Sequence, residues 1–331
     1  MRFFARRRIL APLLAFGLAP VFGTPAALAQ DYPARAITLV VPFAAGGPTD
    51  TIARILAEHM RPLLGQPIVI ENVAGASGTV GSARVARATP DGYTIGIGQW
   101  GTHVLSGAIH TLSYDIAEDF APIGLVANGP QLIVVRKDLP AADASALVAW
   151  LKANPGKATA GTAGPGSGAH VSGLFFQERT GTSFTFVPYR GAGPALNDLM
   201  AGHIDLMFDQ ASNALPQVRG RTVRAIAVTA RTRLATAPDI PTVDEVGLSG
   251  LYIDFWHGTW APKGTPPTVI AKLNAALGAA LDDADVRKRL TDLGQVIPEG
   301  ERRTPDALRT HQKAEIGKWW PIVKAARIKP E

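Results

Sequence analysis

The sequence contains no cysteine among its 331 residues. Disulfides, thiolate nucleophiles, iron–sulfur clusters and cysteine-based zinc sites are therefore excluded together. Neither a P-loop nor a Gly-x-Ser-x-Gly nucleophile elbow occurs. No two of the seven histidines have the i, i+3 or i, i+4 spacing of a helical metal site. We therefore expect no metal, no cofactor and no catalytic centre.

Long apolar runs are also rare. A long one lies at the N-terminus, from Ile9 to Phe22. Four arginines between positions 2 and 8 precede it, and Ala27-Leu28-Ala29 follows. A basic segment, a short apolar run and a small-x-small site are typical of a secretory signal peptide. We predict a signal peptide over residues 1–29, cleaved after Ala29, with the Sec and twin-arginine routes both open.

The net charge is smaller than it first looks. The formal charge is +6, but removal of residues 1–29 removes four arginines and no acid, which leaves +2. One basic cluster remains, and in an exported protein we interpret it as a solvated rim and expect no nucleic-acid partner. Its members are Arg219, Arg221, Arg224, Arg231 and Arg233.

The mature chain alternates short β-rich runs with helical patterns, which predicts an α/β fold with a mostly parallel sheet. Ile37–Val41 is a continuous apolar run, as expected for a strand covered on both faces. The run 120–126 and the run 132–135 predict two further strands, and helices dominate after Trp256. We predict two lobes joined by paired crossovers near 128–131 and 251–256, which would form a hinge. The predicted boundaries are 30–129 for the first part of lobe 1, 130–254 for lobe 2 and 255–331 for the return to lobe 1.

Three glycine-rich loops each follow a predicted strand and precede a helix. They are Pro42–Asp50, Gly75–Gly78 and Ala163–Gly168. Glycines allow close backbone approach, and the free amides of a first helical turn form an anion site. Ligands of α/β proteins bind at such strand ends. Asp50 complicates an anion site, and we interpret it as a cap for the loop amides rather than a ligand contact.

Other chemical signals are weaker. Gly96-Ile-Gly98-Gln-Trp-Gly101 matches a dinucleotide-binding pattern, but Trp100 would crowd a pyrophosphate, so we interpret the match as chance. His103 and His170 each follow a loop that could line a cleft. Hydrogen bonding is the role we expect of both. We expect His110, His203 and His311 on the surface.

Several blocks occur in an order that resembles a known family. They include YPARAITLVVPFAAGGPTD, GQPIVIENVAGASGTVGS, AGPGSGAHVSGLFF, VPYRGAGPALNDLMAGHIDLMFDQ and PDIPTVDEVGL. This pattern resembles the tripartite tricarboxylate transporter receptors, also called the Bug or TctC family, over essentially the whole mature chain. The resemblance implies a periplasmic solute-binding protein of the two-lobed type II fold, with a hinge and a ligand cleft between the lobes.

The resemblance also implies which residues contact the ligand, mainly through loop amides. They are Phe43, Ala44, Ala45, Gly46, Gly47, Thr49, Gly75, Ala76, Ser77, Gly78, Ala163, Gly164, Ser167, His170, Tyr189, Arg190, Gly191, Ala192 and Asp209. Tyr189 could instead serve lobe packing, and Asp209 could anchor a turn or the hinge. Trp100 and Thr102 lie where this sequence departs from the family, and we include both. Trp100 either shapes the distal pocket or fills the core.

The implied function is capture of a small carboxylate, such as a di- or tricarboxylate, an amino acid or an aromatic acid, for a membrane permease. The alternative is a sensor that presents the carboxylate to a histidine-kinase ectodomain. We expect a monomer in either case. Porphobilinogen deaminase shares the two-lobed architecture but attaches its cofactor to a cysteine, so the missing cysteines exclude it.

Overall fold

The structure is a computed structural model that describes residues 32–325. The predicted signal peptide lies outside the described residues. Within them, nine strands are joined in the order β2-β1-β3-β9-β4-β7-β5-β6, with β8 paired to β4. The strands are β1 (Ile37–Val41), β2 (Ile68–Asn72), β3 (Thr94–Gln99), β4 (Phe120–Arg136), β5 (Thr159–Thr162), β6 (Thr185–Pro188), β7 (Leu206–Gln210), β8 (Val223–Val228) and β9 (Asp254–Pro262).

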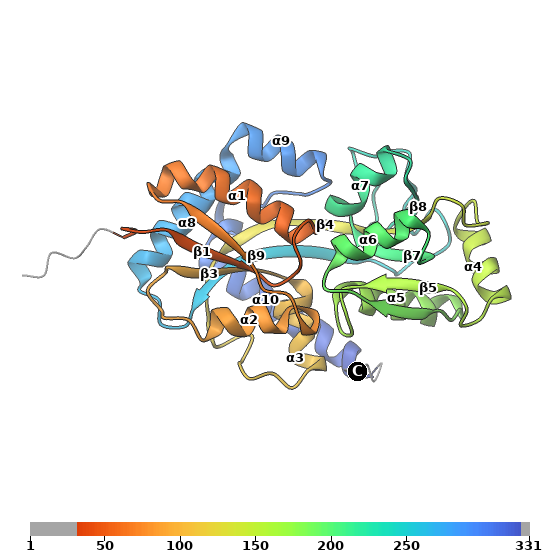
Figure 1. The fold of residues 1–331 in the computed structure, drawn as a ribbon, viewed down its shortest axis with the longest axis horizontal. Coiled ribbons are helices and arrows are strands. Elements are labelled where there is room, and N and C mark those ends of the chain that lie inside the picture. Colours follow the sequence, from red (N-terminus) through yellow and green to blue (C-terminus); the bar gives the residue numbers. More distant parts are fainter. Residues whose placement is uncertain (1–31, 326–331) are drawn as a thin grey trace, which may run out of the picture. The chain divides into compact units, whose positions relative to one another are not determined.

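The helices alternate with the strands through most of the chain and dominate its C-terminal part (Figure 1). The α-helices are α1 (Pro48–Leu64), α2 (Thr79–Ala86), α3 (Ser106–Ile109), α4 (Ala144–Ala153), α5 (Gly168–Thr180), α6 (Ala192–Ala201), α7 (Ala211–Arg219), α8 (Pro267–Asp282), α9 (Ala284–Asp292) and α10 (Pro305–Ala325). Short turns of other helix types are η1 (Ala76–Gly78), η2 (Gly101–Leu105) and η3 (Gly300–Arg303).

Local sequence explains the first unit, β1 followed by α1. All five residues of β1 are β-branched or Leu, and four of them are buried. α1 begins with Pro48 at its first position and ends at Gly65, whose φ of 70° allows the left-handed cap. The helix buries Ile52, Ile55 and Leu56 against the sheet. This packing fixes the start of α1 directly beyond the carboxyl end of β1.

The long strands β4 and β9 run through the middle of the sheet (Figure 1). β4 pairs with β9 as far as Pro130, and from Gln131 it pairs with β7 and β8. The sequence analysis predicted two separate strands here and was wrong, because pairing with β9 carries the chain through Asn128–Pro130 without a break. The outer pairs are parallel, but every pair that involves β4 or β9 is antiparallel, so the expectation of a mostly parallel sheet holds for the outer strands alone.

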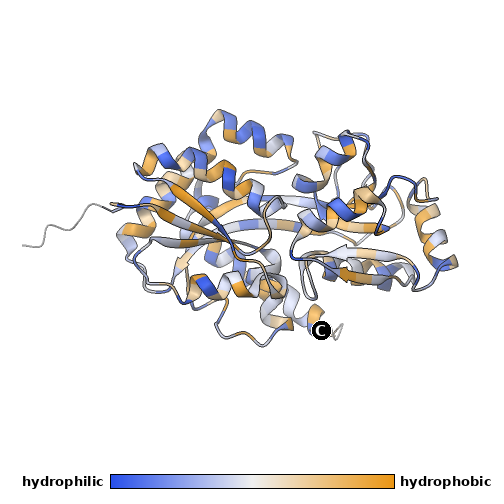
Figure 2. Ribbon diagram, in the orientation of Figure 1, coloured by the Kyte–Doolittle hydropathy of each residue, from blue (hydrophilic) through white to orange (hydrophobic). Residues whose placement is uncertain are grey.

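We call β1, β2, β3, β9 and the first part of β4, with their helices, lobe 1. α1, α8 and α9 cover one face of this sheet, and α2, α3 and α10 cover the other (Figure 1). Lobe 2 contains β5 to β8 and the second part of β4, with α4 and α5 on one face and α6 and α7 on the other. Figure 2 shows the contrast between the hydrophobic strand β1 and the largely hydrophilic α9. Each lobe is therefore a three-layer αβα unit with its own core.

Helices of the C-terminal part contact α1, η2 and β4, and the residues of β4 that share a core with α8 are Ile123, Val126 and Ala127 in its lobe-1 part. None of the helices within residues 32–325 combines the length and the apolarity that a membrane crossing requires.

Candidate functional site

Loops from both lobes surround a cavity of about 510 Å³. Lobe 1 contributes the β1–α1 and β2–α2 loops, and lobe 2 contributes the β5–α5 and β6–α6 loops. The lining residues are Ala44, Gly75, Ala76, Ser77, Gly78, Ala163, Gly164, Pro165, Pro188, Tyr189, Arg190 and Pro194. The structure thus brings nine of the residues named in the sequence analysis to one cavity. The three prolines line it too, and the sequence analysis did not single them out although they lie inside the quoted blocks.

The Asp50 side chain holds the β1–α1 loop in place through hydrogen bonds. Its Oδ2 accepts hydrogen bonds from the Gly46 amide at 2.9 Å and from Arg54 Nε at 2.8 Å. Its Oδ1 accepts from Asn72 Nδ2 at 2.9 Å. Burial alone would raise the pKa of the Asp50 carboxyl, but the bonds from Arg54, Gly46 and Asn72 hold it below its usual value. Asp50 is committed to shaping the loop, as the sequence analysis interpreted it.

Helix N-termini from the two lobes meet beside the cavity. α1 and α6 approach so closely that a Cβ on Gly193 would lie 3.1 Å from the backbone of Gly46 and Gly47. Among the hydrogen bonds of residues 32–325, none occupies the amides of Thr49 and Asp50 in the first turn of α1. Free first-turn amides carry the positive end of the helix dipole. The N-terminus of α1 therefore carries a positive partial charge at the end of the loop whose Ala44 lines the cavity.

Tyr189 and Arg190 form part of the lobe-2 wall. The Tyr189 hydroxyl donates to Asp198 at 2.6 Å, and burial together with this carboxylate raises the pKa of Tyr189 to about 12. The Arg190 carbonyl accepts from the Ala44 amide of lobe 1 at 3.1 Å. The Arg190 guanidinium is exposed, and no ion pair of the described residues involves it. It is the one cationic side chain among the residues that line the cavity.

Other predicted residues, Ser167 and His170 among them, do not line the cavity themselves. Ser167 caps α5 by accepting from the His170 amide, and His170 Nδ1 accepts from the Gly166 amide at 3.1 Å. Burial lowers the pKa of His170 to about 4, so its ring is neutral at pH 7. The remaining members of these loops do not line the cavity but extend the same segments; they are Phe43, Ala45, Gly46, Gly47, Thr49, Gly191 and Ala192.

Trp100, Thr102 and Asp209 are buried in the interior and do not line the cavity. The Trp100 ring packs edge-on against the rings of Phe255 and Trp319, with ring centroids 5.7 Å and 4.8 Å away. This packing favours the core-filling alternative. Thr102 Oγ1 accepts from the Gln99 amide at 3.0 Å.

Asp209 lies at the end of β7. Its carboxyl oxygens accept from the Gln210 amide and from Asn213 Nδ2, and burial raises its pKa to about 7. These contacts match the turn-anchoring alternative for this residue.

The sequence analysis missed His257, a fully buried residue of β9. Its Nε2 lies 3.2 Å from Thr49 Oγ1 at the start of α1, and burial lowers its pKa to about 3. Gln99 of β3 lies directly opposite it in the sheet. Nothing in the local sequence around His257 distinguishes it from an ordinary core residue, because the contact to Thr49 spans 208 positions.

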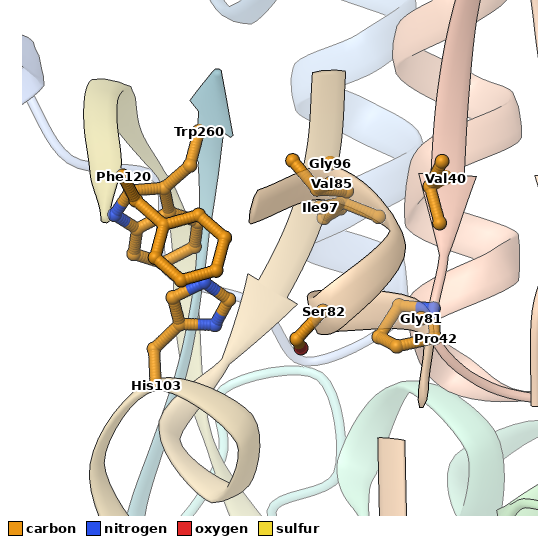
Figure 3. Close-up of a pocket in the computed structure, with 10 residues that line it drawn as sticks. All are labelled: Val40, Pro42, Gly81, Ser82, Val85, Gly96, Ile97, His103, Phe120 and Trp260. Carbon is orange, nitrogen blue, oxygen red and sulfur yellow. The ribbon is translucent and has the colours of Figure 1, made fainter. Parts of the chain in front are cut away.

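A second, much smaller cavity of about 10 Å³ lies inside lobe 1 (Figure 3). His103 stacks on Trp260 at its side, with ring centroids 3.8 Å apart, and burial lowers the pKa of His103 to about 3. The volume suits at most a single water molecule. His103 is therefore a core residue and does not line the cleft. Within the described residues, no group of three or more His, Asp or Glu side chains is arranged to hold a metal ion.

Comparisons with known proteins agree with this geometry. Residues 52–326 match the family model described as tripartite tricarboxylate transporter family receptor, TctC. A UPF0065 protein of Agrobacterium vitis, from the TAR-I ttuE-ttuC' intergenic region, is 42% identical over 320 residues, which cover 96% of this chain and 91% of that protein.

Two solved structures are also similar. The periplasmic binding protein BugD is 41% identical, with a TM-score of 0.87 over 91% of this chain and all of the other. MatC of Rhodopseudomonas palustris, solved with bound malate, is 43% identical, with a TM-score of 0.86 over 88% of this chain and all of the other. The chain therefore belongs to the tripartite tricarboxylate transporter receptor family, whose members are periplasmic solute-binding proteins and not enzymes.

Proposed function

We propose that the protein captures a small dicarboxylate in the cavity between its lobes and delivers it to a membrane permease. The observation that carries this proposal is a cavity lined by glycine-rich loops of both lobes, in which Arg190 is the one cationic lining side chain and the loop of the lining residue Ala44 leads into the N-terminus of α1. A guanidinium and a helix N-terminus are two positive groups that suit an anionic ligand such as a carboxylate. MatC, which was solved with malate, supports a four-carbon dicarboxylate as the first candidate.

Backbone amides can supply the required affinity without a buried arginine clamp. A hydrogen bond to a charged group contributes ~1.5–3 kcal/mol. Three or four such bonds therefore cover most of the ~8 kcal/mol that a micromolar affinity requires. Amide recognition of this kind fixes the carboxylate and leaves selectivity to the side chains around it.

The remaining parts of the proposal concern export and closure. We propose cleavage after Ala29 and delivery of the mature chain to the periplasm, where it acts as a monomer. The proposed lobes are 30–129 with 255–331, and 130–254. The change of partner along β4 at Pro130 and Gln131 supports a hinge at that point. Closure on ligand would then lower the radius of gyration measured by small-angle scattering.

A thermal-shift screen of the mature protein tests the ligand class. The panel contains L-malate, succinate, citrate, L-aspartate, benzoate and the neutral matched compound malamide. We expect L-malate to raise the melting temperature in a concentration-dependent way, because ligand that binds the folded state stabilises it by RT ln(1 + [L]/Kd). Malamide, which lacks both charges, should have no effect. Stabilisation by benzoate alone, or by no acid of the panel, would refute the dicarboxylate assignment.

A further inference from the structure

The Pro165 carbonyl of lobe 2 accepts two hydrogen bonds from lobe 1. Ser77 Oγ donates at 2.6 Å, and His110 Nε2 lies at 3.1 Å. A carbonyl oxygen has two lone pairs and only accepts, so the His110 ring must carry its proton on Nε2. Both acceptor positions of Pro165 are therefore used by the other lobe.

The lobe-2 loop is shaped to fit against these two donors. Gly164 and Gly166 have φ values of 103° and 76°, which other residues rarely adopt. A Cβ on Gly164 would lie 2.7 Å from Ser77 Oγ, and one on Gly166 would lie 2.8 Å from His110 Nε2. The loop thus touches the donors through positions where no side chain fits.

Ser77 and His110 differ in their relation to the cavity. Ser77 lines it, and both Ala76 and Ser77 have positive φ values although neither is glycine. Their conformation needs support from the surrounding structure. His110 follows α3, is half-buried and does not line the cavity. Its side chain is connected to the cavity wall through its hydrogen bond with the lining residue Pro165.

We infer that His110 is a positioning residue: it holds the cavity-lining loop Ala163–Pro165 of lobe 2 against lobe 1 and thereby keeps the two walls of the cavity together. The Ala44 amide, which donates to the Arg190 carbonyl at 3.1 Å, bridges the lobes at a separate point of the same cavity. Loss of the His110 contact should therefore open the Ala44 contact more often.

Amide hydrogen exchange on the ligand-free mature protein tests this inference. We expect His110→Ala to speed exchange at Ala44 about three- to tenfold, the range that one net hydrogen bond corresponds to. His110→Gln, which can still donate to Pro165, should restore slow exchange. Ile52 inside α1 should exchange at the wild-type rate, which shows that the fold is intact. His59→Ala provides the matched control, because this half-buried histidine lies near Asp283 and Asp285, remote from the cavity loops.

Stopped-flow binding of L-malate adds a second readout, which rests on the proposed function. His110→Ala should raise the dissociation rate constant by a similar factor and leave the association rate constant unchanged. If wild-type protein does not bind L-malate, the proposed function fails, while the exchange experiment still decides the role of His110. Equal exchange at Ala44 in the wild type and His110→Ala would overturn the inference, and so would a loss of slow exchange in His110→Gln equal to that in His110→Ala.

Discussion

Thr49 Oγ1 in the first turn of α1 lies 3.2 Å from Nε2 of His257 in β9, and both residues are buried. This contact ties the first turn of α1 to β9, which pairs with β3 and β4 in the sheet of lobe 1. Thr49→Val keeps the shape of the side chain but leaves Nε2 without a partner. We expect it to lower the free energy of unfolding by ~1–3 kcal/mol, the cost of an unsatisfied buried polar group.

Urea denaturation measures this effect, and Thr49→Ser is the control that retains the hydroxyl. Thr49→Ser should lose less stability than Thr49→Val. If Thr49→Val is as stable as the wild type, the contact with His257 contributes nothing to the fold.

Stability should fall steeply in acid because the buried His103 and His257 and the partly buried His170 are neutral in the folded state. Burial lowers the pKa of His103 and His257 to about 3 and of His170 to about 4. Below pH ~6.5 the unfolded chain binds protons that the folded chain does not. Asp209 acts in the opposite sense, because its raised pKa of about 7 lets the folded state keep a proton that the unfolded state releases.

Between pH ~4 and ~6 these four groups together give a net uptake of about two protons on unfolding. Each proton taken up on unfolding changes the free energy of unfolding by ~1.4 kcal/mol per pH unit. Urea denaturation at pH 4.5, 5.5 and 6.5 measures the slope. His257→Gln should reduce the slope of the free energy of unfolding against pH by the contribution of one proton. Asp209→Asn should increase this slope by the same amount. Identical slopes in all three proteins would contradict these assignments.

Gly193 should not tolerate a side chain, although its place in α6 would ordinarily favour one. A Cβ there would lie 3.1 Å from the backbone of Gly46 and Gly47 in lobe 1. We expect Gly193→Ala to weaken L-malate binding about tenfold or more by separating the two helix N-termini. Gly278→Ala in α8 is the matched control, because no atom lies within 4 Å of the added Cβ.

Gly278→Ala should leave binding unchanged and raise stability by ~0.5–1 kcal/mol. Calorimetric titration of both variants with L-malate separates the steric effect from the general effect of replacing glycine. Wild-type affinity in Gly193→Ala would show that the approach of α1 and α6 is not needed for binding.

Trp100 should matter for stability rather than for ligand affinity. It is fully buried against Phe255 and Trp319. Trp100→Phe leaves a partly filled space, and we expect a loss of ~1–3 kcal/mol in the free energy of unfolding. Affinity for L-malate should stay within about twofold. A tenfold loss of affinity with unchanged stability would instead support a role in shaping the distal pocket.

Local sequence patterns predicted the elements that depend on local chemistry. The bounds of β1 agree with the predicted run Ile37–Val41, since a continuous apolar run marks both of its ends. The glycine-rich loops were also identified, because turns that need positive φ restrict the residue type. The order of these segments along an α/β chain was enough to predict that they meet at one cavity.

What the sequence could not show depends on pairing between distant segments. The run Asn128–Pro130 has the composition of a turn, and it is a strand because β9, more than 120 positions away, pairs with it. His257 and His110 were not identified as important for the same reason, since their partners Thr49 and Pro165 are remote in the chain. The role of Trp100 stayed open between the distal pocket and the core, because the neighbours that decide it come from the distant β9 and α10.

Calorimetric titration of the mature wild-type protein with L-malate, beside Arg190→Ala and the matched control Arg287→Ala, tests the proposed binding site most directly. Arg287 pairs with Glu299 in lobe 1 and does not line the cavity. We predict one binding site with an affinity near micromolar in the wild type and in Arg287→Ala, and about tenfold weaker binding in Arg190→Ala. No measurable binding by the wild type, or equal affinity in all three proteins, would contradict a dicarboxylate site between these loops.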